Sequence, residues 1–194
     1  MPRKANSRVL NRASVVQAAA ELIDAMGLEQ VTMAELAERL EIRTPSLYNH
    51  VQGMEGLRRE LALLGIREIT KRVGQVIMGK SGDEAVVVLA DAFRTFVKEH
   101  PGLYTATLRA PASDDTELQK AAQELIDILL KVLSAYHLQE EDGIHAIRML
   151  RSIIHGFTTL EIAGGFELPI ELDETFRRLV SMFLASIKTE KEKV

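Results

Sequence analysis

The sequence predicts an all-α protein of nine helices, arranged as a small helical head followed by a larger helical domain. Apolar residues make up 46% of the chain and recur every three or four positions, which is the spacing of one buried helix face. The segments with this spacing begin at helix-capping residues and are separated by glycine or proline. Runs of β-branched residues bounded by turns, which are typical of strands, are scarce. We therefore expect a core made of helices alone.

The first helix is predicted from Ser14, as its N-cap, to Gly27, which ends it in the left-handed conformation. The arm before this helix contains four basic residues and no acidic one: Arg3, Lys4, Arg8 and Arg12. A basic arm of this kind is suited to contacts with phosphates or with the minor groove of DNA. The alternative role is that of a solubilising tail.

Two short helices are predicted within residues 32–51, TMAELAERLEIRTPSLYNHV, and a three-residue turn at 41–43 joins them. Thr32 followed by Glu35 forms a capping box for the first of these helices. Thr44 is the predicted cap of the second helix, with a proline directly after it, where a missing N–H costs nothing. The segment therefore has the shape of a helix-turn-helix unit.

The second short helix is polar on its outer face. Four of its residues carry hydrogen-bonding groups on short or flat side chains: Ser46, Tyr48, Asn49 and His50. Such side chains suit base edges and phosphates, and a unit of this size fits the major groove of DNA. The alternative is an ordinary helical hairpin whose polar residues meet water. We expect residues 1–52 to be a DNA-binding head.

Residues 53–194 are predicted to form a second domain of helices, separated by short breaks rich in glycine, proline or polar residues. The predicted helices span residues 54–79, 84–99, 103–109, 116–136, 139–163 and 172–187. The long helix at 54–79 joins the head to the remainder, so a change in its tilt would move the head.

The last two helices carry apolar residues on more than one face, which predicts that they need a partner surface. A two-fold homodimer through these helices would form a four-helix bundle and bury both. The alternative is a wide internal face within one chain. The predicted dimer interface consists of Ile147, Ile154, Phe176, Leu179, Val180 and Phe183. A dimer would also place two heads about 34–36 Å apart, as reading a palindrome requires.

The helix at 139–163 contains a polar row at positions 148, 151, 155 and 161, within an otherwise apolar pattern. This row has three interpretations, as an anchor for a ligand, as a buried polar network or as a solvated edge. Nearby aromatic residues predict either a ligand cavity or plain core. The predicted ligand-binding residues are Phe93, Phe96, Tyr104, Leu108, Arg151, His155, Phe157 and Glu161. Gly156, in the middle of this helix, indicates a close helix approach or room for a ligand.

Composition argues against several classes of function. The net charge of −4 is inconsistent with a histone-like, charge-driven DNA binder, although not with a site-specific one. The absence of cysteine excludes disulfides and thiolate metal sites and favours a reducing cytosol. The histidines show no metal-ligand spacing and there is no glycine-rich phosphate loop, so neither a metal nor a cofactor is expected. No apolar stretch is long enough to predict a membrane-spanning helix.

Two other classes compete with a DNA-binding regulator on the residues alone. One is a helical-bundle enzyme or metal protein, which the histidine spacing disfavours. The other is an adaptor whose head binds a protein, which the basic arm disfavours.

Several segments resemble the TetR-type family of bacterial one-component regulators. The resemblance rests on VVQAAAELIDAMG, VTMAELAERL and RTPSLYNHV in the first 51 residues. Two later segments, HPGLY and IHGFTTLEIAGGF, resemble the subgroup with a WHG-type ligand domain. The His-Gly pair of that signature falls on His155 and Gly156, whereas its tryptophan has no counterpart in a chain without tryptophan.

The resemblance implies a nine-helix, Ω-shaped homodimer in the bacterial cytoplasm that represses a promoter until a small-molecule effector binds. It implies base and phosphate contacts around the second short helix, with Tyr48 and His50 largely on phosphates. Together with the arm, the predicted DNA-binding residues are Arg3, Lys4, Arg8, Thr32, Arg43, Thr44, Pro45, Ser46, Tyr48, Asn49 and His50. Two positions depart from the family pattern. Glu41 replaces the usual turn glycine, and Met54 replaces a lysine that contacts phosphate.

Overall fold

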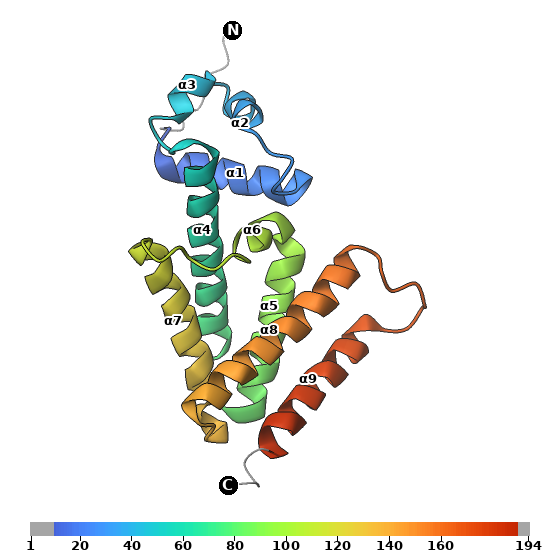
Figure 1. Cartoon of the computed structure of the whole chain (residues 1–194). Coiled ribbons are helices and arrows are strands. Elements are labelled where there is room, and N and C mark those ends of the chain that lie inside the picture. Colours follow the sequence, from blue (N-terminus) through green and yellow to red (C-terminus); the bar gives the residue numbers. More distant parts are fainter. Residues whose placement is uncertain (1–9, 190–194) are drawn as a thin grey trace. The chain divides into compact units, whose positions relative to one another are not determined.

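The computed structural model describes residues 10–189, apart from the side chains of residues 140 and 189. Across this range the chain forms nine α-helices and one 3-10 helix, with no strand, which confirms the predicted fold class (Figure 1). The helices are α1 (Arg12–Met26), α2 (Met33–Arg39), α3 (Thr44–Leu47), α4 (Gly53–Val76), α5 (Gly82–Glu99), α6 (Pro101–Ala106), α7 (Thr116–Leu133), the 3-10 helix η1 (Ser134–Tyr136), α8 (Glu140–Ile162) and α9 (Leu172–Thr189).

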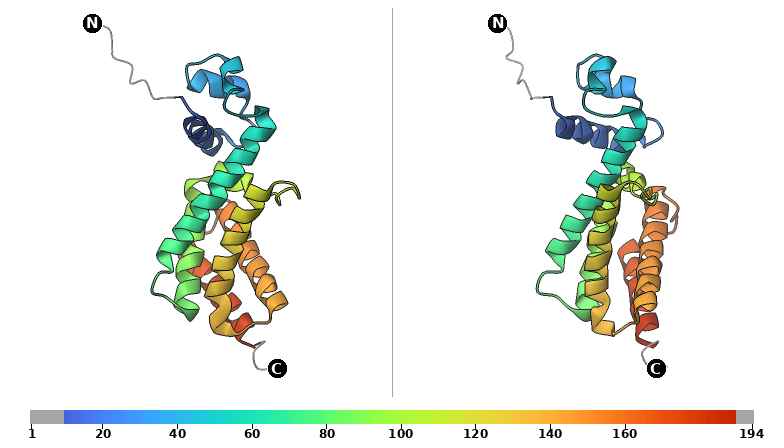
Figure 2. Two further views of the ribbon diagram at one scale, coloured as in Figure 1. Left: turned by 90° about the vertical axis from the view of Figure 1, so that its left-hand side faces the viewer. Right: turned by 60° about the vertical axis from the view of Figure 1, so that its left-hand side comes forward.

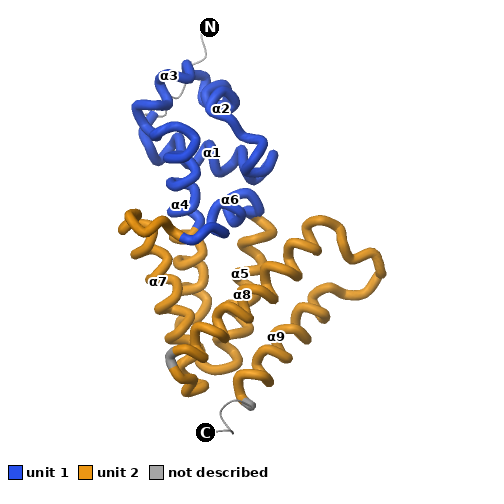
Figure 3. Tube along the Cα trace, viewed as in Figure 1, with its two compact units in different colours: residues 1–65, 100–110 blue, residues 66–99, 111–194 orange. Residues whose placement is uncertain are grey.

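The helices group into two compact units (Figure 3). Within the described residues, unit 1 comprises residues 10–65 and 100–110, and unit 2 comprises residues 66–99 and 111–189. The long helix α4 contributes its first half to unit 1 and its second half to unit 2. These units are defined by packing, and the predicted functional division after residue 52 stays a prediction.

Unit 1 is built on α1, whose start differs from the prediction. Asn11, not Ser14, is the N-cap, and its side chain accepts a hydrogen bond from the Ser14 N–H at 2.9 Å. The Ser14 hydroxyl oxygen in turn accepts from the Asn11 N–H at 3.0 Å, which completes a capping box. Ser14 was the wrong cap because serine serves equally well at the third helical position of such a box.

The short helix α6 packs on α1 within unit 1. It has no N-cap side chain of its own, and Asp24 of α1 takes that place. The Asp24 carboxylate accepts the Leu103 N–H at 2.8 Å and lies 2.8 Å from Nδ1 of His100. A Cβ added at Gly102 would lie 2.0 Å from the Ile23 carbonyl oxygen, so the two backbones approach more closely than any side chain allows.

In unit 2, α5 packs against α7, α8 and α9, and α8 packs against α7 and α9 (Figure 2). The large side chains that are almost fully enclosed in this unit are Ile69, Leu89, Phe96, Ile154, Phe176, Phe183 and Ile187. They come from α4, α5, α8 and α9, so the core of unit 2 joins segments that are far apart in the sequence. Along residues 10–189, no helix combines the length and the apolar character that crossing a bilayer requires.

Candidate nucleic-acid interface and effector domain

The first helix of the helix-turn-helix pair is capped as the sequence predicts. The Thr32 hydroxyl oxygen accepts the Glu35 N–H at 3.2 Å, and the Glu35 carboxylate accepts the Thr32 N–H at 2.7 Å. The Thr32 hydroxyl also donates to the same carboxylate at 2.9 Å. The side chain of Thr32 is therefore fully engaged in starting α2, and a contact of Thr32 with DNA stays a prediction.

The turn between α2 and α3 depends on Glu41, which adopts a left-handed backbone conformation with φ of 56°. The Ile42 N–H donates to the Ala37 carbonyl and the Glu41 N–H to the Glu38 carbonyl, both at 3.0 Å. This pair of bonds is the Schellman motif, in which glycine normally occupies the left-handed position. Glu41 itself therefore adopts the left-handed conformation, which is strained for a non-glycine residue, and a neighbouring residue of the turn does not.

The second helix, α3, spans only four residues and begins one residue earlier than predicted. Arg43 is its N-cap, without a side-chain cap hydrogen bond, so Thr44 is the first helical residue and not the cap. Residues 48–50 form a turn after the helix, and Leu47 and Val51 are buried beneath it.

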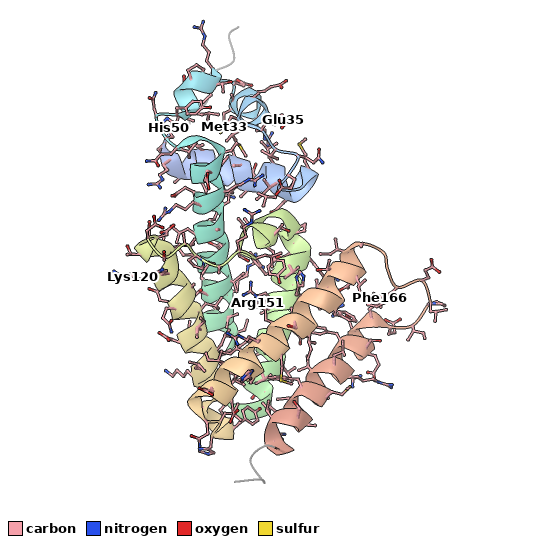
Figure 4. The ribbon with its side chains drawn as sticks, in the orientation of Figure 1. Met33, Glu35, His50, Lys120, Arg151 and Phe166 are labelled. Carbon is pink, nitrogen blue, oxygen red and sulfur yellow. The ribbon has the colours of Figure 1, made fainter. Side chains whose placement is uncertain are left out.

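The polar side chains around α3 face outward as predicted. Arg43, Pro45, Tyr48 and Asn49 are exposed, and Tyr48 retains 58% of its accessible surface. Thr44, Ser46 and His50 are half-buried (Figure 4 labels His50). All seven residues therefore retain accessible surface in unit 1. The predicted contacts of Arg3, Lys4 and Arg8 lie outside the described residues.

A hollow of about 410 Å³ adjoins this surface within unit 1. It is lined by Arg12, residues 48–52, Gly56, Arg59 and Glu60. One carboxylate oxygen of Glu60 accepts hydrogen bonds from both Arg59, at 2.7 Å, and Arg12. Arg59 and Glu60 were not among the predicted site residues. Basic residues close to the start of the long helix were the available sequence signal.

The predicted ligand-binding residues are divided between the two units. In unit 1, Tyr104 is buried and Leu108 is exposed. In unit 2, Phe93, Phe96 and Phe157 are buried, His155 is half-buried and Arg151 is exposed (Figure 4 labels Arg151). Two hollows within unit 2, of about 460 and 540 Å³, are lined by none of these residues. Of the two alternatives at Gly156, the close helix approach is not found, because a Cβ there would meet nothing within 4 Å among the described residues, and room for a ligand stays a prediction.

Glu161, the predicted acidic anchor, is already engaged by a buried arginine. Arg94 donates to the two carboxylate oxygens of Glu161 at 2.8 and 2.9 Å and to Asp173 at 2.8 Å. Its guanidinium carbon lies 5.1 Å from the ring centroid of Phe157 and 4.8 Å from that of Phe176. Arg94 is therefore the centre of a cluster that joins α5, α8 and α9.

The electrostatics of this cluster follow from its hydrogen bonds. The bonds from Arg94, and then those from Lys98, hold the pKa of Glu161 below its usual range against the opposing effect of burial. Arg94 was not predicted as a functional residue. The sequence signal was a lone arginine on the apolar stripe of α5, one residue after Phe93.

Most of the residues predicted for the dimer interface lie in the core of the chain itself. Ile154, Phe176, Val180 and Phe183 are at most 3% exposed, whereas Ile147 and Leu179 are half-buried. Periodicity identified them as apolar, but the helices that cover them belong to the same chain. Other large apolar residues of this region are exposed instead: Met149, Leu160, Ile162, Leu168, Ile170 and Met182.

Comparison with known proteins matches both parts of the chain. Residues 15–61 match the model for bacterial regulatory proteins of the tetR family, and residues 86–183 match the tetracyclin repressor-like C-terminal domain. The HTH-type transcriptional regulator YobS of Bacillus subtilis is 33% identical over 92% of this chain and 93% of its own length. The HTH-type transcriptional regulator Rv0681 of Mycobacterium tuberculosis is 35% identical, with coverage of 92% and 82%.

The fold is also shared with solved structures. A TetR variant from Acinetobacter baumannii AYE, in complex with minocycline, superposes with a TM-score of 0.71 at 19% identity, over 94% of this chain and 98% of that protein. At that identity the likeness concerns the fold alone. The two family matches and the two HTH-type relatives show more, and the chain belongs to the TetR family of bacterial transcriptional regulators, which bind DNA and are not enzymes.

Proposed function

We propose that this regulator is a repressor that binds a palindromic operator as a homodimer and leaves it when a small-molecule effector binds. Residues 1–52 would bind DNA, and residues 53–194 would bind the effector and the second copy. The observation that carries the proposal is the outer surface of unit 1. There the polar side chains around α3 are exposed or half-buried, while Leu47 and Val51 beneath them are buried. Such a surface presents donors and acceptors to a groove without loss of core packing.

The homodimer is supported by the exposed apolar residues of α8 and α9. Met149 and Leu160 on α8 and Met182 on α9 are between 43% and 69% exposed in the single chain. Leu179, half-buried, lies one turn before Met182 on the same helix. We propose that these residues, rather than the four buried ones, form the contact between copies. Burial of their surface would contribute about 25 cal/mol for each Å² removed from water.

Release by an effector would be a shift between two populated conformers. The effector need only bind more tightly to the conformer whose heads are wrongly spaced for the two half-sites. The polar row on α8, in which Arg151 is exposed and His155 is half-buried, supports an effector that carries hydrogen-bonding groups. The repressor-like C-terminal match and the minocycline complex of the Acinetobacter TetR support a small-molecule effector in general.

Fluorescence anisotropy with the promoter region of the chain's own gene tests DNA binding. The double variant Tyr48→Ala with Asn49→Ala removes two exposed side chains at α3 and is expected to weaken specific binding by about 10-fold to 100-fold. The matched control is Gln119→Ala with Gln123→Ala, two exposed positions of α7. Absence of specific binding by the wild type at moderate salt, or equal binding by the α3 variant, would contradict the proposal.

A further inference from the structure

We infer that the hollow between α5 and α9 is a binding site for a small zwitterion of the α-amino acid type, with Asp91 binding its ammonium group and Arg94 its carboxylate. The hollow measures about 460 Å³ and lies within unit 2. Sites for small molecules typically have a volume in this range. The inference goes beyond the proposed function, because it holds whether or not the chain represses a promoter.

The border of the hollow carries equal numbers of basic and acidic side chains. The three basic ones are Arg94, Lys98 and Arg177, and the three acidic ones are Asp91, Asp173 and Glu174. A ligand with a single charge would leave this set unbalanced, whereas a zwitterion adds no net charge and offers a partner to each sign. Val87 and Val180 also border the hollow, and they provide apolar surface for an aliphatic side chain of the ligand.

Asp91 is the acidic group of this border that is open to a ligand. It accepts no hydrogen bond and forms no ion pair with any other residue that the structure describes. Asp173, by contrast, accepts a hydrogen bond from Arg94, and Glu174 accepts one from Arg178. Partial removal from water raises the pKa of Asp91, although its side chain keeps accessible surface. An ammonium group in the hollow would stabilise this carboxylate in its charged form.

Arg94 is the basic group that is fixed in place before a ligand binds. Its side chain is 9% exposed, and its guanidinium carbon lies 5.1 Å from the ring centroid of Phe157 and 4.8 Å from that of Phe176. Two hydrogen bonds to Glu161 and one to Asp173 use three of its five N–H donors among the described residues. One N–H of each terminal nitrogen remains, and a carboxylate can accept from both nitrogens at a low entropic cost.

The spacing of the two groups fits a compact ligand. Asp91 and Arg94 are three residues apart on α5, so their Cβ atoms lie about 5–6 Å apart on one face of the helix. They do not form an ion pair with each other, although each would be within reach of one small molecule. The ammonium and carboxylate groups of an α-amino acid are attached to the same carbon, which matches this short separation.

The test begins with thermal unfolding of the full chain in the presence of each of the twenty standard L-amino acids, at a concentration on the order of 10 mM. A ligand that binds the folded chain raises the melting temperature. We expect this for at least one aliphatic amino acid, whose affinity is then measured by calorimetric titration. Its analogues without the carboxylate or without the ammonium group are each expected to bind at least about tenfold more weakly.

Asp91→Asn is the variant that tests the ammonium side of the site. It is expected to weaken binding of the amino acid about tenfold and to leave binding of the analogue without the ammonium group unchanged. Glu84→Gln is the matched control, because Glu84 is an exposed carboxylate of α5 that does not border the hollow. Arg94→Lys tests the carboxylate side, with circular dichroism as the check of folding. If that variant does not fold, the analogue without the carboxylate decides this side of the site.

Absence of binding by all twenty amino acids would overturn the inference. Equal binding of the amino acid and its two analogues would also overturn it, as would unchanged binding in Asp91→Asn or an equal loss in Glu84→Gln. None of these measurements involves DNA. Binding to the operator therefore tests the proposed function separately, and either can fail without the other.

Discussion

At the scale of single residues, Glu41 shows how far local sequence determines local structure. The capping pattern of Thr32 and Glu35 was readable because both partners of each hydrogen bond lie within four residues. The resemblance to the TetR family implied that this turn usually contains a glycine, at the position of Glu41. It did not determine which residue would adopt the left-handed conformation, because that depends on where α2 ends.

Replacing Glu41 by glycine is expected to stabilise the protein. A left-handed conformation costs a non-glycine residue roughly 1 kcal/mol, and Glu41→Gly would remove that cost at the turn. The free energy of unfolding, measured by urea titration, should rise by about 0.5–1 kcal/mol.

The control is Glu38→Gly, three residues earlier in the exposed part of α2. There the same substitution should lower stability by about 1 kcal/mol, since glycine is unfavourable in a helix interior. Equal effects of the two substitutions would show that Glu41 is not strained in solution.

The Arg94 cluster predicts a dependence of stability on acid. Because the folded protein lowers the pKa of Glu161, the stabilisation is fully present above the unfolded pKa, near 4.3, and is lost as pH falls through the folded pKa. Glu161→Gln should therefore lose about 3 kcal/mol at neutral pH, because a buried pair is broken. Its stability should also fall less than that of the wild type on acidification.

Asp173→Asn is the matched change on the same arginine. The Asp173 side chain is 87% exposed, so its loss should cost less than about 1 kcal/mol. Thermal unfolding of both variants between neutral and acidic pH provides the measurement. Equal losses at Glu161 and Asp173 would contradict the description of a buried pair.

At the scale of elements, the helices themselves were predictable and their docking was not. Apolar periodicity and glycine or proline breaks are local, so they placed every helix to within a few residues. The N-cap of α6 comes from Asp24, which lies 79 residues before its partner Leu103. No pattern around Pro101 indicates that partner, so the packing of α6 on α1 was outside the reach of sequence reasoning.

Gly102→Ala is expected to disturb the packing of α6 on α1. The added methyl group would meet the backbone of Ile23, which cannot move without shifting α1. Overpacking of this kind typically costs 1–3 kcal/mol, so the melting temperature should fall clearly.

The control for this change is Gly74→Ala in α4, where an added Cβ meets no atom of the described residues within 4 Å. That substitution should raise stability by up to about 1 kcal/mol, since alanine is the better helix former. A neutral effect of Gly102→Ala would mean that the two helices do not approach as closely as described.

At the scale of the whole molecule, the sequence indicated an apolar surplus in the last two helices without saying what covers each residue. Periodicity separates apolar from polar positions, but it cannot distinguish a neighbour in the same chain from a second copy. The fold settles the first half of that question, since Ile154, Phe176, Val180 and Phe183 are covered by their own chain. The exposed methionines of α8 and α9 are the better candidates for contact with a second copy of the chain.

Met182→Lys is expected to weaken the homodimer. Met182 is 69% exposed in the single chain, and in a two-fold dimer each substitution acts twice. Loss of two buried methionines at roughly 1.5 kcal/mol each corresponds to about a 100-fold rise in the dimer dissociation constant. Analytical ultracentrifugation measures this directly. Met78→Lys, at a position that is 72% exposed after α4, is the control and should leave the dimer unchanged.

A homodimer of this regulator would read two half-sites of DNA, one with each head. Selection of bound duplexes from a random-sequence pool tests this most directly. We expect enrichment of palindromic sequences whose half-site centres lie about 10 base pairs, or a multiple of that, apart. Tyr48→Ala with Asn49→Ala should abolish the enrichment. No enrichment by the wild type, or enrichment of single, unpaired sites, would contradict it.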